Sequence, residues 1–153
     1  MGFSLAGLLV GLAILLPSLL LLALPARDTP PLQPEPLPLT VLERGGQMGC
    51  LVLATIIASV PGSWWWGAAV VVCVLAYYAL WIRFFSTGRS FAALYAPLGP
   101  IPVPMAVFPV LAFLACAAWL GNWWLAAAAL VLAIAHITTS LRIARALRES
   151  DPA

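Results

Sequence analysis

The 153-residue chain contains no lysine and few charged residues of either sign. Its seven basic residues are all arginine, and with five acidic residues the charged fraction is 8%, against about 25% in soluble domains. Apolar residues make up 64% of the chain, and the mean hydropathy is +1.08. So few charges cannot cover a water-soluble surface, which predicts an integral membrane protein. The net charge of +2, without a basic patch, excludes nucleic acid as a partner.

Side chains that carry chemistry are also scarce. The chain has one histidine, His136, and three cysteines, none of which stand in a CxxC pair. Cys50, Cys73 and Cys116 all fall inside apolar stretches at different expected depths, so we interpret them as small apolar fillers. We expect neither a disulfide framework nor a metal site. Because no motif of a known catalytic centre is present, we predict no catalytic residue and no cofactor.

Long apolar runs are abundant instead. Five of them approach or exceed the roughly 20 helical residues that cross about 30 Å of hydrocarbon. Backbone groups in lipid must bond within their own segment, so each run is predicted to be a helix. The predicted spans are residues 3–24, 41–60, 64–82, 104–120 and 123–141. The expected fold is an all-α membrane protein, a five-helix transmembrane bundle that forms a single domain over residues 1–153.

The arginines predict the orientation of this bundle. With five spans, all seven fall on one side of the membrane, and the opposite side carries no charged residue in its two short hairpins, 61–63 and 121–122. The positive-inside rule then places the C-terminus in the cytoplasm and the N-terminus outside. Tryptophans at 64–66 and 123–124 follow the two hairpins as an aromatic belt. Arginine without lysine, together with abundant alanine, indicates a GC-rich genome, so we expect a multi-pass protein of a bacterial cytoplasmic membrane.

The connecting segments are predicted from their composition. Residues 25–40 are proline-rich and are interpreted as an extended cytoplasmic linker. The longest connection, 83–103, either lies in the membrane interface or re-enters the bundle. Residues 142–153 form a basic cytoplasmic tail, in which Arg142, Arg145 and Arg148 are expected to contact lipid headgroups.

Glycines four residues apart indicate close helix packing. The pairs are Gly7 with Gly11 and Gly45 with Gly49. Small residues at this spacing let helix backbones approach each other in lipid. Packing within the chain is favoured over a homodimer.

Polar side chains inside the predicted spans gather near the cytoplasmic side. Glu43 and Gln47 are four apart and share one helical face, while His136 lies in the last span with Thr139 and Ser140 beside it. We expect Glu43, Gln47, His136 and Arg83 to converge on a ligand-binding site, since polar groups in a membrane are costly. In the other interpretation, which the sequence favours, His136 is a hydrogen-bond anchor between helices, and Glu43 and Arg44 are ordinary interfacial charges.

The segment 42–50, LERGGQMGC, resembles a family of short, uncharacterised bacterial multi-pass membrane proteins. The family pattern is close to E-x-x-G-R-x-G-C, after a Leu-Pro step in the first helix and before a late histidine. The matching positions are Leu16, Pro17, Glu43, Gly46, Gly49, Cys50 and His136. Gln47 stands where the family has a basic residue. The resemblance implies the architecture and no activity.

Three functions remain open from the sequence. The favoured one is a non-enzymatic binding or accessory subunit, whose polar face in the cytoplasmic leaflet contacts a lipid-like ligand or a membrane protein partner. The second is a small proton-coupled transporter, but Glu43 lies near the membrane edge rather than at the midplane. The third is an intramembrane enzyme with His136 as general base, but no nucleophile with an orienting partner accompanies it.

Overall fold

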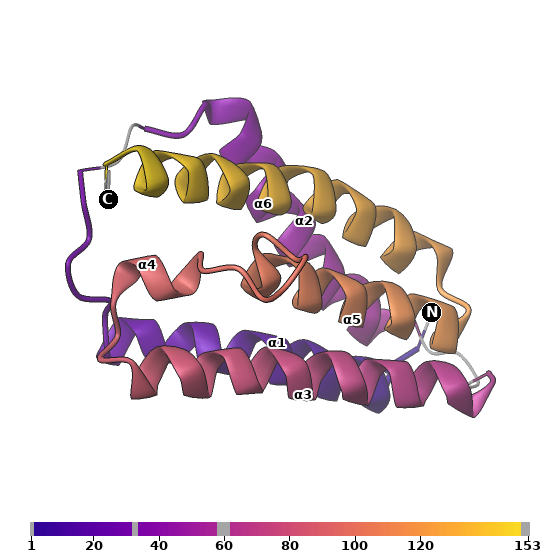
Figure 1. Cartoon of the computed structure of the whole chain (residues 1–153). Coiled ribbons are helices and arrows are strands. Elements are labelled where there is room, and N and C mark those ends of the chain that lie inside the picture. The colour runs from indigo at the N-terminus through magenta and orange to yellow at the C-terminus, as the bar shows by residue number, and fades with distance from the viewer. Residues whose placement is uncertain (1, 32–33, 58–61, 151–153) are drawn as a thin grey trace.

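The computed structural model describes residues 2–31, 34–57 and 62–150, and over these ranges the chain is all-α (Figure 1). The described helices are α1 (Leu5–Ala23), α2 (Leu37–Ile56), α3 (Trp64–Ser86), α4 (Phe91–Leu94), α5 (Pro104–Leu120) and α6 (Trp123–Ser150). Three of them, α1, α3 and α6, are long and apolar enough to cross a membrane, and α5 is a shorter apolar helix. The prediction of an all-α chain with long apolar helices is confirmed.

Several helix ends differ from the predicted boundaries. Helix α2 begins at Leu37, so the prediction of an extended linker over 25–40 is wrong for its last four residues. The reason is that proline is tolerated in the first turn of a helix, where its missing N–H has no intrahelical role; here Pro36 is the N-cap and Pro38 lies in the first turn. Residues 58–60 of the predicted second span lie outside the described residues. Helix α6 continues to Ser150, so the predicted basic tail is helical as far as it is described.

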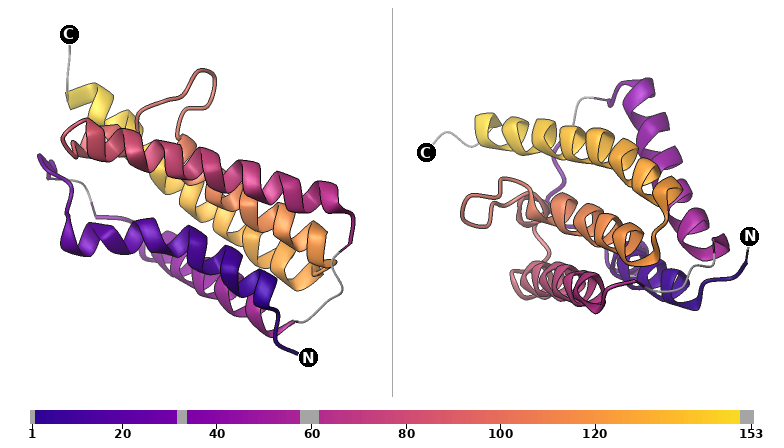
Figure 2. Two further views of the ribbon diagram at one scale, coloured as in Figure 1. Left: turned by 90° about the horizontal axis from the view of Figure 1, so that it is seen from below. Right: turned by 90° about the vertical axis from the view of Figure 1, so that its right-hand side faces the viewer.

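Helix α5 is the central element of the bundle. It packs against α1, α2, α3 and α6, and the views in Figures 1 and 2 place it between α3 and α6. Ten of its 17 residues are buried, among them Ala112, Ala115 and Ala117. A helix that is apolar all round is buried on all sides, and its small residues let four neighbours approach.

The two ends of the bundle differ in composition. At one end, the segment after α1 pairs with the turn after α3: the Arg27 N–H donates to Arg89 O at 2.8 Å, and the Phe91 N–H donates to Arg27 O at 3.0 Å. Helix α4 and the C-terminal end of α6 lie at this end (Figure 1). At the other end, Asn122 begins α6 by accepting from the Leu125 N–H, and its amide donates to Leu53 O of α2. The tryptophans at 64–66 and 123–124 are all exposed there.

Helices α2 and α6 run antiparallel, and small residues on α2 let the two backbones approach closely. A Cβ on Gly46 would lie 2.9 Å from the Cα of Leu132, and one on Gly49 would lie 3.3 Å from Ala128 Cβ. The expected packing role therefore falls on Gly46 rather than Gly45, which has nothing within 4 Å of the position of its Cβ.

Helix α1 approaches α2 in the same way. A Cβ on Gly7 would overlap the carbonyl of Ala54, and one on Gly11 would lie 3.0 Å from Leu51. Gly7, Gly11 and Gly49 thus face helices of the same chain, as expected, whereas Gly45 does not. Cys50 and Cys116 are fully buried in the apolar core, and Cys73 is half-buried.

Candidate functional site

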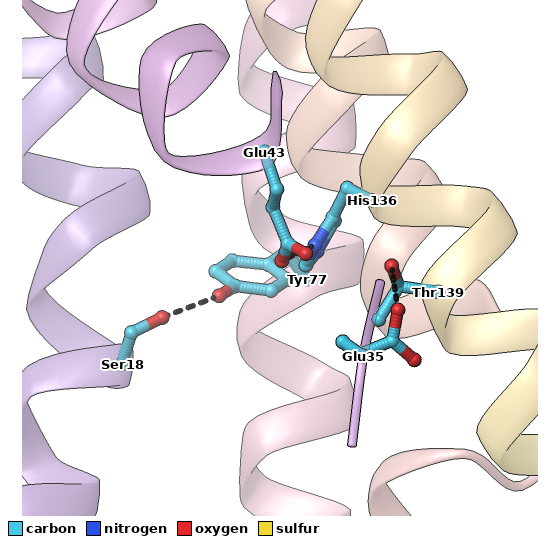
Figure 3. A network of polar contacts seen from close by, with 6 residues as sticks. All are labelled: Ser18, Glu35, Glu43, Tyr77, His136 and Thr139. Atoms are coloured by element: carbon cyan, nitrogen blue, oxygen red, sulfur yellow. Dashed lines mark hydrogen bonds and ion pairs between the residues drawn. The ribbon is translucent and has the colours of Figure 1, made fainter. Parts of the chain in front are cut away.

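The polar site is organised around a contact between α2 and α6. The Glu43 Oε1 lies 2.7 Å from the His136 Nδ1, and both side chains are about three-quarters buried. Figure 3 shows the carboxylate directed at the imidazole ring. Glu43 precedes Gly46 by one helical turn and His136 follows Leu132 by one turn, so the close approach of the two helices sets this distance. Two of the predicted site residues are thereby brought together.

This contact determines what the histidine can do. A carboxylate can only accept a hydrogen bond, so Nδ1 carries the proton and donates a hydrogen bond to Glu43. In the neutral ring Nε2 is then an acceptor, and in the protonated ring it is a donor. No residue of the described ranges hydrogen-bonds to Nε2 of His136. The side chain is therefore held in one orientation while its second nitrogen is available to a bound molecule.

A second carboxylate reaches the same face of α6 from outside the helices. The Thr139 hydroxyl donates to Glu35 Oε2 at 3.2 Å (Figure 3). Glu35 precedes α2 in the proline-rich connection, which the sequence analysis interpreted only as a linker. A sequence signal could have identified Glu35: it is an acidic residue that stands alone between Pro34 and Pro36, just before the helix.

Helices α1 and α3 contribute a hydroxyl pair that the sequence analysis missed. The Tyr77 Oη and the Ser18 Oγ are 3.2 Å apart, and Tyr77 is buried (Figure 3). Both residues lie within strongly apolar helices, where a single tyrosine or serine is common. Their proximity depends on how α1 packs against α3, which local sequence does not show.

Two cavities meet at these side chains. The larger, about 210 Å³, has Gln47 and Met48 in its wall, and the smaller, about 160 Å³, has Trp81 and Ser140. Three polar residues line both cavities: Ser18, Tyr77 and His136. The remaining walls are largely apolar. Gln47 is thus near His136, as predicted, although its ligand-binding role stays a prediction.

Tyr95, just after α4, also lines the smaller cavity. Burial and the nearby carboxylates of Glu43 and Glu35 raise the pKa of its phenol to about 12. The phenol is therefore neutral over the physiological range, and the surroundings of this cavity carry negative potential.

Arg83 is not brought to Glu43 and His136. Its guanidinium donates to the carbonyls that end α4 and follow it, those of Ala93, Ala96 and Pro97, at 3.1–3.5 Å. The last carbonyls of a helix lack intrahelical partners, so a cation near them is stabilised there. The expected convergence of Arg83 with Glu43 is therefore wrong, and its observed contacts organise the 91–97 segment.

The three arginines expected at lipid headgroups lie on the last turns of α6. Arg142, Arg145 and Arg148 are exposed. Arg148 also lines a hollow of about 340 Å³ together with Tyr95 and Pro97. Headgroup contact by these side chains stays a prediction.

No family model matches the chain, and no match is found among curated proteins or among solved structures. What the site does must follow from its own side chains. Over the described ranges, no group of three or more His, Cys, Asp or Glu side chains is placed to hold a metal ion. The arrangement that is present, two largely apolar cavities joined at a few polar groups, is the usual make-up of a small-molecule site.

Proposed function

We propose that all five long helices cross a bacterial cytoplasmic membrane, with the N-terminus outside and the C-terminus in the cytoplasm. The arginine-rich connections and the exposed tryptophans at opposite ends of the bundle support this orientation. Large apolar side chains exposed along α1, among them Leu5, Leu9 and Leu12, fit a surface that faces lipid.

Single cysteines test the orientation, in a chain whose three native cysteines are replaced by alanine. Ser63→Cys, at the tryptophan end, should react with a membrane-impermeant maleimide in intact spheroplasts. Asp28→Cys, at the arginine end, should react only after the membrane is opened. The reverse pattern would contradict the proposed orientation. Labelling of both positions from one side would contradict a membrane crossing by α2, the helix between them.

Within this membrane protein, we infer a non-enzymatic binding function: a lipid-like molecule enters between the helices and its polar group reaches His136. The observation that carries this proposal is that His136, held by Glu43, lines both cavities together with Tyr77 and Ser18. Mostly apolar walls with a few fixed polar groups select an amphiphile over a water-soluble metabolite.

Native mass spectrometry of the gently solubilised protein tests this function. The wild type should retain a small molecule that His136→Ala loses. Ile134→Ala, an exposed position on the same helix that lines neither cavity, is the matched control and should retain it. A co-purifying protein that persists in every variant, with no small molecule, would favour an accessory subunit instead. A bare chain in all samples would contradict ligand binding.

A proton-coupled transporter is the second candidate, because titratable groups extend from the segment before α2 into the cavities. Glu35 contacts Thr139, and His136, one turn earlier on α6, contacts Glu43 and lines both cavities. In reconstituted vesicles, a transporter should release its co-purified molecule when the internal pH is lowered, and Glu43→Gln should abolish that response. Release that ignores pH would argue against this candidate.

A further inference from the structure

We propose that the smaller cavity receives the polar end of an uncharged lipophilic molecule, and that this polar end is a carbonyl acceptor such as a quinone ring. The inference rests on the proposed binding function and names the class of its ligand. Four observations support it: an unpaired donor, the size of the cavity, the sign of the nearby charges, and an adjoining apolar hollow.

The unpaired donor is the indole N–H of Trp81. The side chain is 5% exposed, and its Nε1 is the one buried side-chain polar atom of the described residues that makes no hydrogen bond of good geometry, although the Tyr77 hydroxyl lies beside it. Tyr78, one turn away, shows the usual outcome, since its hydroxyl donates to Ala13 O at 3.0 Å. A buried donor left unpaired costs free energy and is rare in folded proteins. Trp81 lines the smaller cavity together with Tyr77, so a ligand oxygen that displaces the Tyr77 hydroxyl from beside the indole can supply the missing acceptor.

The cavity suits one ring with hydrogen-bonding substituents. Its volume is about 160 Å³, and an apolar cavity of about 150 Å³ holds a benzene molecule. Further groups able to donate line the same space, namely the hydroxyls of Tyr77 and Ser140, and the Nε2 of His136 donates as well when the ring is protonated. Leu21, Leu94 and Met105 form apolar walls. Donors among apolar walls match a ring that carries carbonyl oxygens.

The nearby charges exclude an anionic head group. Glu43 is bonded to His136, and Glu35 is bonded to Thr139, so both carboxylates lie beside the cavity. Arg83, the arginine in the last turn of α3, is directed to backbone carbonyls instead. A phosphate or carboxylate would therefore be repelled. A cationic head group would be attracted, but it would leave the Trp81 N–H without an acceptor.

An apolar hollow beside the cavity gives room for a hydrocarbon chain. Trp81 also lines this second space, of about 190 Å³, between α1 and α3. Its other walls include Leu16, Leu20 and Ile82. A molecule with its ring in the cavity can thus extend a tail past the indole along the lipid-facing side of these helices.

The test compares four probes that share a decyl chain, each titrated into the full chain in nanodiscs with empty nanodiscs as the partition control. They are a trimethyl decyl benzoquinone, the same alkylbenzene without carbonyl oxygens, decyltrimethylammonium and decyl phosphate. The quinone should bind most tightly. Trp81→Phe, which removes the N–H and keeps an aromatic ring, should weaken the quinone about fivefold and leave the alkylbenzene unchanged. Trp66→Phe, at an exposed indole, is the control and should change neither probe.

Each outcome decides the ligand class. Equal weakening of the quinone and the alkylbenzene by Trp81→Phe would show that the indole only packs, and would overturn the proposal. Tighter binding of the ammonium or phosphate probe would also overturn it while leaving the binding function intact. Should Trp81→Phe not fold, the ranking of the probes on the wild type still decides. If no probe binds and no molecule co-purifies, the proposed binding function itself fails.

Discussion

Gly46 of α2 packs directly against the backbone of Leu132 of α6, so closely that a Cβ at Gly46 would lie 2.9 Å from the Leu132 backbone nitrogen. One turn along each helix, the same approach brings Glu43 and His136 to 2.7 Å. The absence of a side chain at Gly46 therefore lets α2 and α6 approach closely enough for Glu43 and His136 to meet.

Gly46→Ala should destabilise the protein by about 1–3 kcal/mol, because the added methyl group has only backbone to displace. Gly45→Ala is the matched control, since it has nothing within 4 Å and alanine favours the helix. Thermal unfolding of both variants in the same detergent gives the comparison. Equal midpoints for the two variants would show that α2 and α6 do not touch at Gly46.

Glu43→Ala should change the tautomer of His136. In the wild type the carboxylate holds the proton on Nδ1, and without it the ring should shift toward the Nε2–H form. Because His136 is the only histidine, selective ¹⁵N-histidine labelling gives the signals of one ring. Arg44→Ala, next in sequence and exposed, serves as control. An unchanged ¹⁵N spectrum in Glu43→Ala would mean that the contact does not exist in the membrane.

Arg83→Gln should loosen the segment after α3 without unfolding the bundle. The guanidinium hydrogen-bonds to three carbonyls at once, so its loss should speed amide hydrogen exchange at residues 93–96 about tenfold. Arg83→Lys should give an intermediate rate, because a single ammonium cannot span the same three oxygens. Hydrogen exchange followed by mass spectrometry measures both. Wild-type rates in Arg83→Gln would contradict this capping role.

The protein should lose stability in alkaline solution through Tyr95. Its pKa is raised in the folded chain to about 12, above the ordinary value of 10, so the folded state holds the phenolic proton more tightly than the unfolded state. The resulting stabilisation is complete below about pH 10 and is lost as the pH rises from there through 12. Ultraviolet difference spectra should show a late-ionising tyrosine that Tyr95→Phe removes, and Glu43→Gln should bring its ionisation to lower pH. A spectrum unaltered by Tyr95→Phe would contradict this assignment.

Much of the site could be predicted because helical spacing is local information. The close-packing glycines Gly7 and Gly11 follow from their four-residue spacing, and the expected depths place Glu43 and His136 near the same side of the bundle. That the two side chains meet was left open by the sequence and is shown by the structure. The Arg83 prediction failed because the carbonyls in and after α4 accept hydrogen bonds from its guanidinium, and the composition of the 91–97 segment does not reveal its path. Glu35 was missed for a related reason, since the connection it lies in folds back on α6.

The sequence by itself determined that this chain is all-α with long apolar helices. Long apolar runs leave water, and away from water the backbone N–H and C=O groups must hydrogen-bond within their own segment, which a helix allows. The tertiary structure alone decided that α5 lies at the centre, that Tyr77 meets Ser18, and that Trp81 lines a cavity with its N–H unpaired. Ser18 and Tyr77 are 59 positions apart, and the cavity beside Trp81 is lined by residues from Ser18 to Ser140. These relations depend on which helix packs beside which, and an apolar helix surface carries little local signal about its neighbour.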